Sequence, residues 1–357
     1  MQARSISLRA VSIAALLASS AFAASAQSTV TVYGVVDMYL QYGKGTSTQT
    51  QIQSGGLNGS RVGFKGAEDL GDGLKSIFQL EMGINADTGS SGQGGLAFGR
   101  QAYVGLQSSS LGQLTLGRQY TPQFSNIDGF DAFGTGLGSG VESGILSTTV
   151  RANNSVAYKS PVAGGFSAQA LVSLGESATA GQKAYGNIYS GAVNYAAGPY
   201  SAALTLTQQK RTATTGKDTN SVLATAAYDF GAFKVLGGVQ WVKDLDLAKL
   251  VDSTAASAYG KRVEGYLGVN VPVNAMDTVT AAVAGSRSKD IDGFGSSELS
   301  LGYTHGLSKR TTVYAVGSLI NNGSATNWTA TGATGSGPAT APGKDVKALQ
   351  LGIRHAF

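Results

Sequence analysis

After residue 26 the chain alternates apolar and polar residues with a period of two, and this alternation restricts it to long β-strands. No segment of it sustains the 3.6-residue spacing of an amphipathic helix. The first alternating segment, residues 29–42, carries Val30, Val32, Gly34, Val36, Met38 and Leu40 on one face and Thr31, Tyr33, Asp37, Tyr39 and Gln41 on the other. Strands of this length cross a lipid bilayer at a tilt, with the apolar face toward lipid. The pattern therefore predicts an all-β chain with membrane-crossing strands.

Sixteen segments with this character are predicted along the chain. They are residues 29–42, 57–66, 73–84, 98–109, 111–120, 153–160, 165–175, 187–197, 199–210, 220–230, 232–243, 260–271, 277–288, 296–304, 310–320 and 346–357. A pattern defines such boundaries only to within about 2–4 residues, so fourteen or eighteen strands stay open as alternatives. An even number agrees with a closed, antiparallel transmembrane β-barrel of the bacterial type.

The links between the predicted strands alternate in length. Short links occur at residues 108–110, 161–164, 197–198, 231 and 306–309, and long polar links at residues 44–56, 85–97, 121–152, 244–258 and 321–344. Short turns at one end and long loops at the other are typical of membrane barrels. A soluble sandwich or propeller does not keep this order, so the pattern favours a single barrel domain.

Residues 1–26 have the features of a cleaved secretory signal peptide. Arg4 and Arg9 give a basic start, an apolar stretch follows at residues 11–24, and small residues end the segment. A spanning helix needs about 20 apolar residues, and the chain has no such run. The predicted organisation is therefore a signal peptide at 1–26 and a barrel at 27–357, in an exported protein.

The composition argues against several other classes. Without the signal segment the chain has 24 Lys and Arg against 21 Asp and Glu, a net charge of +3, and no dense basic run, so nucleic acid is not an expected partner. The absence of cysteine excludes disulfides, thiolate metal sites and cysteine nucleophiles. The two histidines, His305 and His355, lie at predicted turn ends, and no Gly-x-Ser-x-Gly motif occurs. We therefore expect no catalytic residues, metal or cofactor.

Short motifs along the chain follow one another in a characteristic order. They are Val32-Tyr33-Gly34-Val35-Val36-Asp37, the stretch from Ser60-Arg61-Val62-Gly63-Phe64 to Gly73, Phe98-Gly99-Arg100-Gln101-Ala102-Tyr103, Gly117-Arg118-Gln119-Tyr120-Thr121-Pro122, Asn154-Ser155-Val156-Ala157-Tyr158 and the terminal Phe357. In this order they resemble the Gram-negative general porins, particularly the β-proteobacterial type of Neisseria, Bordetella and Comamonas. The resemblance covers the whole chain after the signal segment.

The resemblance implies a 16-stranded, homotrimeric barrel in the outer membrane whose third outer loop folds into the pore. It implies outer-membrane lipid and lipopolysaccharide as surroundings, and recognition of Phe357 by the barrel-assembly machinery. It also implies a general diffusion porin for small hydrophilic solutes. A substrate-selective porin for a sugar or an organic anion is the alternative, and a barrel enzyme is a less favoured one.

The best candidate for the inward loop is the segment between residues 122 and 152. Its apolar side chains, at Phe124, Ile127, Phe130, Phe133 and Leu137, are explained if the loop packs on the inner wall. A connection of this length without structure of its own is often functional. Its carboxylates are Asp128, Asp131 and Glu142.

Basic residues are expected to face this loop across the pore. Arg61 shares a strand face with Gly63 and Lys65, opposite Val62 and Phe64, so its side chain is predicted to point into the lumen. For Arg100 the alternation favours the outer face and the resemblance the inner one, and we follow the resemblance. The resemblance also places Arg151 there. Arg118 and Lys159 are further candidates, with a solvated rim position as the alternative.

One departure from the family pattern bears on ion selectivity. Porins of this type often carry Pro-Glu-Phe-Gly on the inward loop, and this chain has Asp131-Ala132-Phe133-Gly134. Ala132 thus stands where the family has a carboxylate. Fewer acids facing the same arginines make the local potential more positive, so we expect the pore to favour anions.

Overall fold

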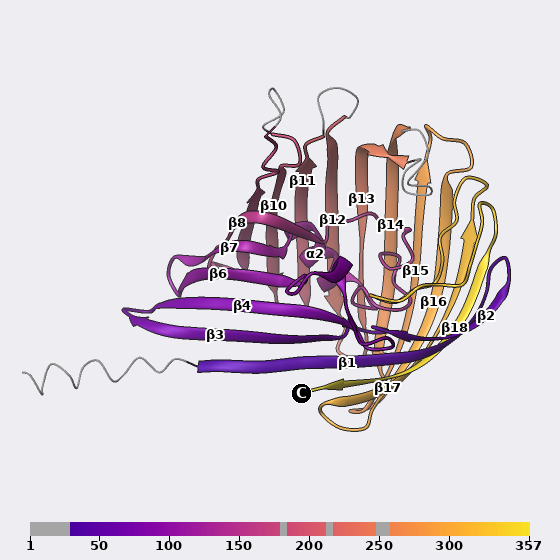
Figure 1. Cartoon of the computed structure of the whole chain (residues 1–357), viewed down its shortest axis with the longest axis horizontal. Coiled ribbons are helices and arrows are strands. Elements are labelled where there is room, and N and C mark those ends of the chain that lie inside the picture. The colour runs from indigo at the N-terminus through magenta and orange to yellow at the C-terminus, as the bar shows by residue number, and fades with distance from the viewer. Residues whose placement is uncertain (1–28, 179–183, 212–216, 248–257) are drawn as a thin grey trace, which may run out of the picture.

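A single antiparallel sheet closes on itself in the computed structural model, which describes residues 29–178, 184–211, 217–247 and 258–357 (Figure 1). Its strands are β1 (Thr29–Lys44), β2 (Thr48–Ser54), β3 (Arg61–Gly71), β4 (Leu74–Asn85), β5 (Ser90–Ser91), β6 (Gln101–Ser108), β7 (Gly112–Tyr120), β8 (Arg151–Lys159), β9 (Phe166–Ser173), β10 (Ile188–Ala197), β11 (Tyr200–Gln209), β12 (Thr219–Asp229), β13 (Lys234–Asp246), β14 (Tyr259–Pro272), β15 (Asp277–Ser288), β16 (Gly295–Gly306), β17 (Thr311–Asn322) and β18 (Val346–Ala356). The signal segment predicted at 1–26 lies outside the described residues.

The eighteen labelled strands make a barrel of sixteen. β2 and β3 pair one after the other along the same side of β1, so together they form one interrupted strand. β5 has two residues and pairs only with the end of β4. Pairing of β1 with β18, from Val35 opposite Ala356 to Lys44 opposite Lys347, closes the ring. The prediction of a 16-stranded antiparallel barrel is confirmed.

The second predicted strand and the first predicted loop were partly wrong. The strand expected at 57–66 runs over 61–71, and most of the loop expected at 44–56 is β2. The sequence of β2, Thr-Gln-Thr-Gln-Ile-Gln-Ser, has Ile52 as its only apolar residue, so it lacks the apolar alternation by which the other strands were recognised. Between β2 and β3 the backbone leaves the wall at Gly55. Its φ of +77° is a conformation that glycine adopts readily.

The wall has its apolar side outside, as the alternation predicts. On β1, Val36 and Leu40 are 41% and 45% exposed, whereas Asp37 and Gln41, which directly follow them, are completely buried. The same alternation runs along β16 and β18. The buried hydrophobic clusters lie instead inside the ring, where loops pack on the inner wall.

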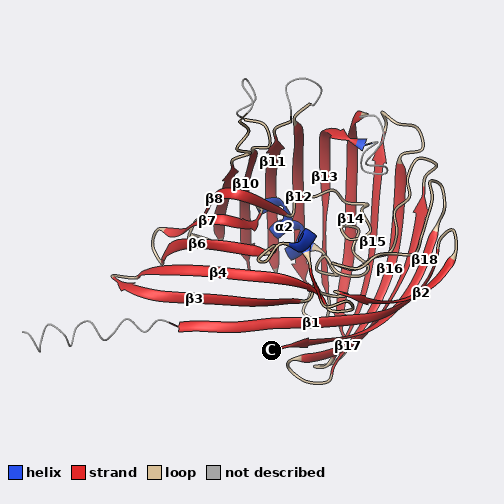
Figure 2. Ribbon diagram, viewed as in Figure 1, coloured by secondary structure: helices blue, strands red, loops and turns tan. Residues whose placement is uncertain are grey.

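Long and short connections lie at opposite ends of the barrel, which confirms the alternation seen in the sequence (Figure 2). At the turn between β3 and β4, Gly71, Asp72 and Gly73 all have positive φ, between 51° and 88°, which Gly and Asp tolerate best. The chain end lies at the same end of the barrel as these turns. There the backbone of Phe357 exchanges two hydrogen bonds with Gly34, of 3.0 and 3.1 Å, and its ring lies over the glycine.

The connection between β7 and β8, residues 121–150, enters the barrel and crosses its interior. Its first part is helix α2 (Pro122–Phe130), although no regular structure was predicted there. Thr121 caps the helix by accepting a hydrogen bond from the Phe124 N–H, and Pro122 occupies its first turn, so a start signal was present in the sequence. Among the described residues no helix is long and apolar enough to span a membrane.

Side chains of α2 fasten it to the far wall of the barrel. The Gln123 amide donates to the Gln240 side chain at 2.8 Å and to Ser221 at 3.1 Å, and Asn126 donates to Thr205 at 2.7 Å. These partners lie on β11, β12 and β13. The inward position expected for this loop is therefore the one that the structure shows.

A second long connection, residues 323–345 between β17 and β18, also folds inward, although we expected an outer loop. The backbone of Ala333 donates to the Gly55 carbonyl at 2.8 Å, and that of Gly332 to the Tyr39 hydroxyl at 3.2 Å. Thr334 donates to the Ser54 carbonyl at 2.9 Å. The interruption between β2 and β3 thus provides the backbone groups that receive this loop.

Candidate functional site

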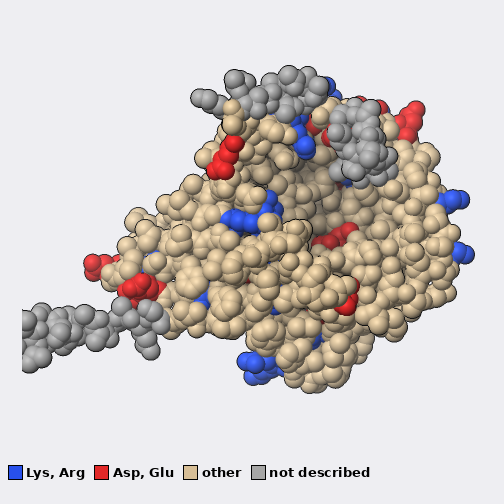
Figure 3. Space-filling view, viewed as in Figure 1, with Lys and Arg blue, Asp and Glu red and all other residues tan. Residues whose placement is uncertain are grey.

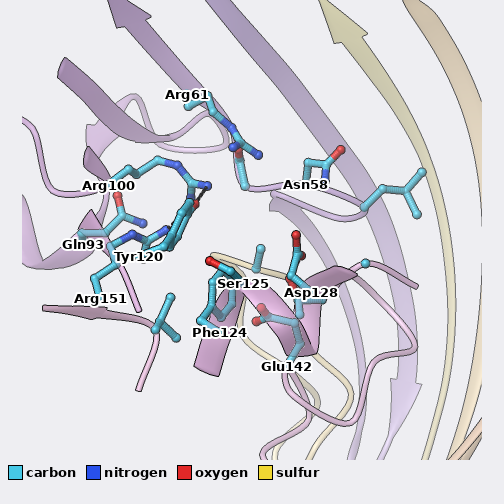
Figure 4. Close-up of a pocket in the computed structure, with 16 residues that line it drawn as sticks. Asn58, Arg61, Gln93, Arg100, Tyr120, Phe124, Ser125, Asp128, Glu142 and Arg151 are labelled. Atoms are coloured by element: carbon cyan, nitrogen blue, oxygen red, sulfur yellow. Dashed lines mark hydrogen bonds between the residues drawn. The ribbon is translucent and has the colours of Figure 1, made fainter. Parts of the chain in front are cut away.

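A cavity of about 380 Å³ lies between the inner wall and the inward loop. Arg61, Arg100 and Arg151 line its wall side, with Tyr120 among them, and Asp128 and Glu142 face them from the loop (Figure 4). The space-filling view shows the hollow itself, with basic side chains on one side of it and acidic side chains on the other (Figure 3). Cations and carboxylates therefore face each other across this cavity.

Arg61 and Arg100 share a carboxylate behind them. Arg100 Nε lies 2.7 Å from Glu81 Oε1, and Arg61 Nη1 lies 3.9 Å from the same oxygen. Glu81, on β4, is only 3% exposed, and it also accepts a hydrogen bond of 2.9 Å from the Tyr33 hydroxyl. Glu81 holds the two guanidiniums in place while they, rather than Glu81, line the cavity.

Arg100 faces the lumen although the alternation in the following strand favoured the opposite side. β6 begins one residue later, at Gln101, so Arg100 does not belong to the pleated part of the chain. Its backbone N–H donates to the Glu81 carbonyl at 3.1 Å, and its side chain to the Glu81 carboxylate. Outside a pleated strand, the direction of a side chain is set by its hydrogen-bond partners and not by the alternation. Arg100 therefore points into the lumen, toward Glu81.

Tyr120 connects Arg100 with Arg151, and it was not among the predicted site residues. Its hydroxyl accepts hydrogen bonds from Arg100 at 2.8 Å and from Arg151 at 3.0 Å. The Arg151 guanidinium lies over the Tyr120 ring, 4.6 Å from its centroid, and that ring stacks on Phe124 of α2. Its position in the sequence could have indicated this role, because Tyr120 is the last residue of β7 before the inward loop.

The three predicted loop acids have different environments. Asp128 lines the cavity and accepts a hydrogen bond of 2.6 Å from Thr135. Asp131 is buried away from the cavity, where it accepts hydrogen bonds from Ser139 and from the Phe133 N–H and so shapes the loop. Glu142 lines the cavity, and burial, reinforced by the nearby Asp131, raises the pKa of Glu142 to about 7.

Ala132, at the position of the family carboxylate, lies close against Gly268 of β14. A side chain on Gly268 would overlap the Ala132 methyl group, so the loop and the wall approach closely here. This position contributes no charge to the cavity.

Arg118 and Lys159 do not join the cluster around the cavity. Arg118 lies at a register shift between β7 and β8, and its guanidinium donates to the Gly99 carbonyl at 2.7 Å and to Asn153. Lys159 is the last residue of β8, at the turn end of the barrel, opposite Gln113 and Gln169.

A buried ion pair on β14 fastens the far end of the inward loop. Arg262 Nε lies 3.2 Å from Glu264 Oε1, and both side chains are fully buried. Arg262 donates to the Ile145 carbonyl and, at 2.9 Å, to Ser286. Glu264 accepts hydrogen bonds from the backbone and hydroxyl of Ser147, at 2.8 and 2.5 Å. Each member of the pair therefore holds a different residue of the loop.

The same arginine connects the two inward loops. Its guanidinium carbon lies 5.5 Å from the ring centroid of Trp328, in the connection 323–345, and 5.6 Å from that of Phe294. Aromatic faces attract a cation at such distances. Arg262 thus contacts the loop that carries Asp128 and Glu142 on one side and the last loop on the other.

Comparisons with known proteins agree on one family. A family model described as Gram-negative porin matches residues 10–337. Outer membrane porin protein 32 of Delftia acidovorans is 33% identical over 97% of this chain and 99% of its own length. The anion-selective porin from Comamonas acidovorans has a TM-score of 0.81 at 30% identity, covering 93% of this chain and 100% of that one. The trimer form of OmpT from Vibrio cholerae, with a TM-score of 0.66 at 15% identity, shares the fold.

The pKa of Glu142 predicts that ion selectivity changes with pH. The carboxyl is charged above its pKa of about 7 and neutral below it, while Arg100 and Arg151 stay charged. Its other charged neighbours are Asp128 and Asp131. Reversal potentials in a salt gradient should therefore move toward anions as the pH falls from about 8.5 to about 5.5, with a midpoint near 7. Glu142→Gln should remove this step, and a step that persists in the variant would assign it to another group.

Removing one member of the buried Arg262–Glu264 pair should destabilise the protein more than replacing both members. Arg262→Met leaves Glu264 buried and unpaired, so we expect a loss of about 3–5 kcal/mol in the free energy of unfolding. The double variant Arg262→Met/Glu264→Met should lose less than Arg262→Met alone. Denaturant midpoints measured by loss of the folded band in gels would show this. Asp218→Asn, which breaks a partly exposed pair with Lys210, is the control and should cost at most about 1 kcal/mol. A double variant weaker than either single one would contradict the argument.

Proposed function

The chain belongs to the Gram-negative porin family, and we propose that its constriction makes it a general diffusion channel that favours anions. As a general porin of the outer membrane it carries out no bond chemistry. Its activity is to set the width and the electric field of a water-filled passage, because these decide which solutes cross.

The main support for this proposal is that the arginines are exposed to the lumen while most of the nearby carboxylates are not. Arg61, Arg100 and Arg151 all line the cavity, and their guanidiniums keep their charge at neutral pH. Glu81 lies behind two of them, and Asp131 is buried within the loop. A passing ion therefore meets more positive than negative charge at the surface.

The low-dielectric walls strengthen this effect. Field lines from the guanidiniums are focused through the narrow lumen rather than spread through bulk water. Glu142 is only partly charged near neutral pH, since its pKa is about 7, and Ala132 supplies no carboxylate. Asp128 is then the principal acid that opposes the three arginines. The anion-selective porin of Comamonas acidovorans, at 30% identity over nearly the whole chain, supports the same sign.

The finer partners of the family belong to the same proposal. We propose a homotrimer, supported by family membership and by the trimer form recorded for OmpT, whose fold this chain shares. The outward apolar face would contact outer-membrane lipid and lipopolysaccharide. The barrel-assembly machinery would recognise Phe357. Residues 1–26 would be removed as a signal peptide on export.

Charge removal at the constriction should change selectivity. We expect Arg61→Ser and Arg151→Ser to move the reversal potential in a potassium chloride gradient toward cations, changing the permeability ratio roughly several-fold. The shift should shrink at high ionic strength, where the screening length shortens. The aperture should widen and single-channel conductance rise, while the barrel still folds.

Lys159→Ser is the matched control for these variants. It removes the same charge from the inner face of β8, far from the cavity, and should shift the reversal potential much less. Equal shifts in all three variants would show that overall charge, not the constriction, sets selectivity. Cation preference in the unmodified channel would refute the proposed sign.

Trimer assembly predicts three coupled conductance levels for each insertion. Planar-bilayer recordings of the purified protein should show channels that enter together and close in three equal steps, because each protomer holds its own pore. Chemical cross-linking in detergent provides the independent measurement, and isolated single steps with a monomeric cross-linking pattern would exclude the trimer.

A further inference from the structure

The lumen contains a second cavity, of about 420 Å³, beside the constriction. Residues 141–150 of the inward loop form one side of it, and the inner faces of β11, β12 and β13 form the other. Trp328 of the last loop closes a third side. Glu142 and Val150 line both cavities, so a solute that leaves the second cavity is next to the arginines.

An apolar surface distinguishes the second cavity from the constriction. Leu146, Val242, Leu245 and Trp328 line it, and all four belong to the buried hydrophobic cluster inside the barrel. Passage of hydrophilic solutes requires no such surface. A solute with an apolar body would pack against it.

The polar groups around the cavity are two arginines, the Glu142 carboxylate and several hydroxyl and amide groups, and some of the donors among them have no partner. Arg211 lines it without forming an ion pair with any described residue. Its Nε, the Thr148 hydroxyl and the Trp328 Nε1 are buried and have no hydrogen-bond partner in the described part of the chain. Unpaired buried donors are costly, so a ligand that brings acceptors is favoured. Arg262 also lines the cavity, but Glu264 neutralises it.

We propose that this second cavity is a binding subsite for organic anions with an aromatic body. Arg211 would pair with the carboxylate, and the indole of Trp328 with Leu245 and Val242 would contact the ring. Arg211 follows the last residue of β11, at the loop end of that strand. The inference rests on the channel function of the protein but not on the sign of its selectivity.

Tryptophan fluorescence can report on this subsite alone. The chain has two tryptophans, Trp241 and Trp328, and Trp241 is 49% exposed on the outer, lipid-facing side of β13. Trp241→Phe therefore leaves Trp328 as the only tryptophan, and its emission is followed with excitation that tyrosine does not absorb. Benzoate should change its emission saturably. Acetate, which has the charge without the ring, and benzyl alcohol, which has the ring without the charge, should each need roughly tenfold higher concentrations.

The matched pair Arg211→Gln and Lys210→Gln tests the proposed role of Arg211. Both remove one positive charge at neighbouring positions, but Lys210 pairs with Asp218 at 2.6 Å and does not line the cavity. In the Trp241→Phe background, Arg211→Gln should raise the half-saturating benzoate concentration roughly tenfold, as loss of a charge-assisted hydrogen bond does. Lys210→Gln should leave it unchanged.

Two outcomes would overturn the inference. One is a linear, unsaturable response of Trp328 in which benzoate and acetate act alike. The other is an equal weakening by Arg211→Gln and Lys210→Gln. Neither outcome touches the proposed anion preference, which is measured in potassium chloride without benzoate. Conversely, a cation-selective channel that still binds benzoate at Trp328 would retain the subsite and lose the proposed selectivity.

Discussion

The fold depends on one requirement, which is that every backbone N–H and C=O crossing the hydrocarbon layer must be paired within the protein. Pairing of β1 with β18 satisfies the last open edge and makes the sheet a ring. Once the ring exists, alternate side chains face lipid and lumen, and the lumen is lined with polar groups. The two inward loops use those groups, since Gln123, Asn126 and Ser147 all bind side chains of the inner wall.

The arrangement of charges around the first cavity follows from how these loops are held. Tyr120 and Glu81 order the three arginines on the wall, and Arg262 and Glu264 order the opposite end of the loop. The interruption between β2 and β3 lets the chain turn inward just before Arg61. A fixed arrangement of charge thus arises from hydrogen bonds between elements far apart in the sequence, rather than from any single strand.

The strands were predictable because lipid exposure imposes an apolar residue at every second position, as from Val30 to Leu40. β2 was not predicted because Ile52 is its only apolar residue, so neither face shows an apolar alternation. Arg61 could be placed by alternation, whereas Arg100 takes its direction from Glu81, a contact that only the folded barrel provides. The inward course of residues 323–345 was not predicted for a similar reason. Its partners, Ser54, Gly55 and Tyr39, lie 278 to 293 residues earlier in the chain.

The bond between Gly34 and Phe357 has a consequence for how the molecule can form. It joins the first strand to the end of the last one, so in the described part of the chain a contact of very high sequence separation takes part in closing the ring. Until it forms, β1 and β18 present unpaired edges, which are templates for pairing with other chains. Such non-local contacts are slow to form because loop-closure entropy opposes them. Ring closure is therefore the step at which folding competes with aggregation, and the loops must enter the lumen of a barrel whose seam joins β1 to β18.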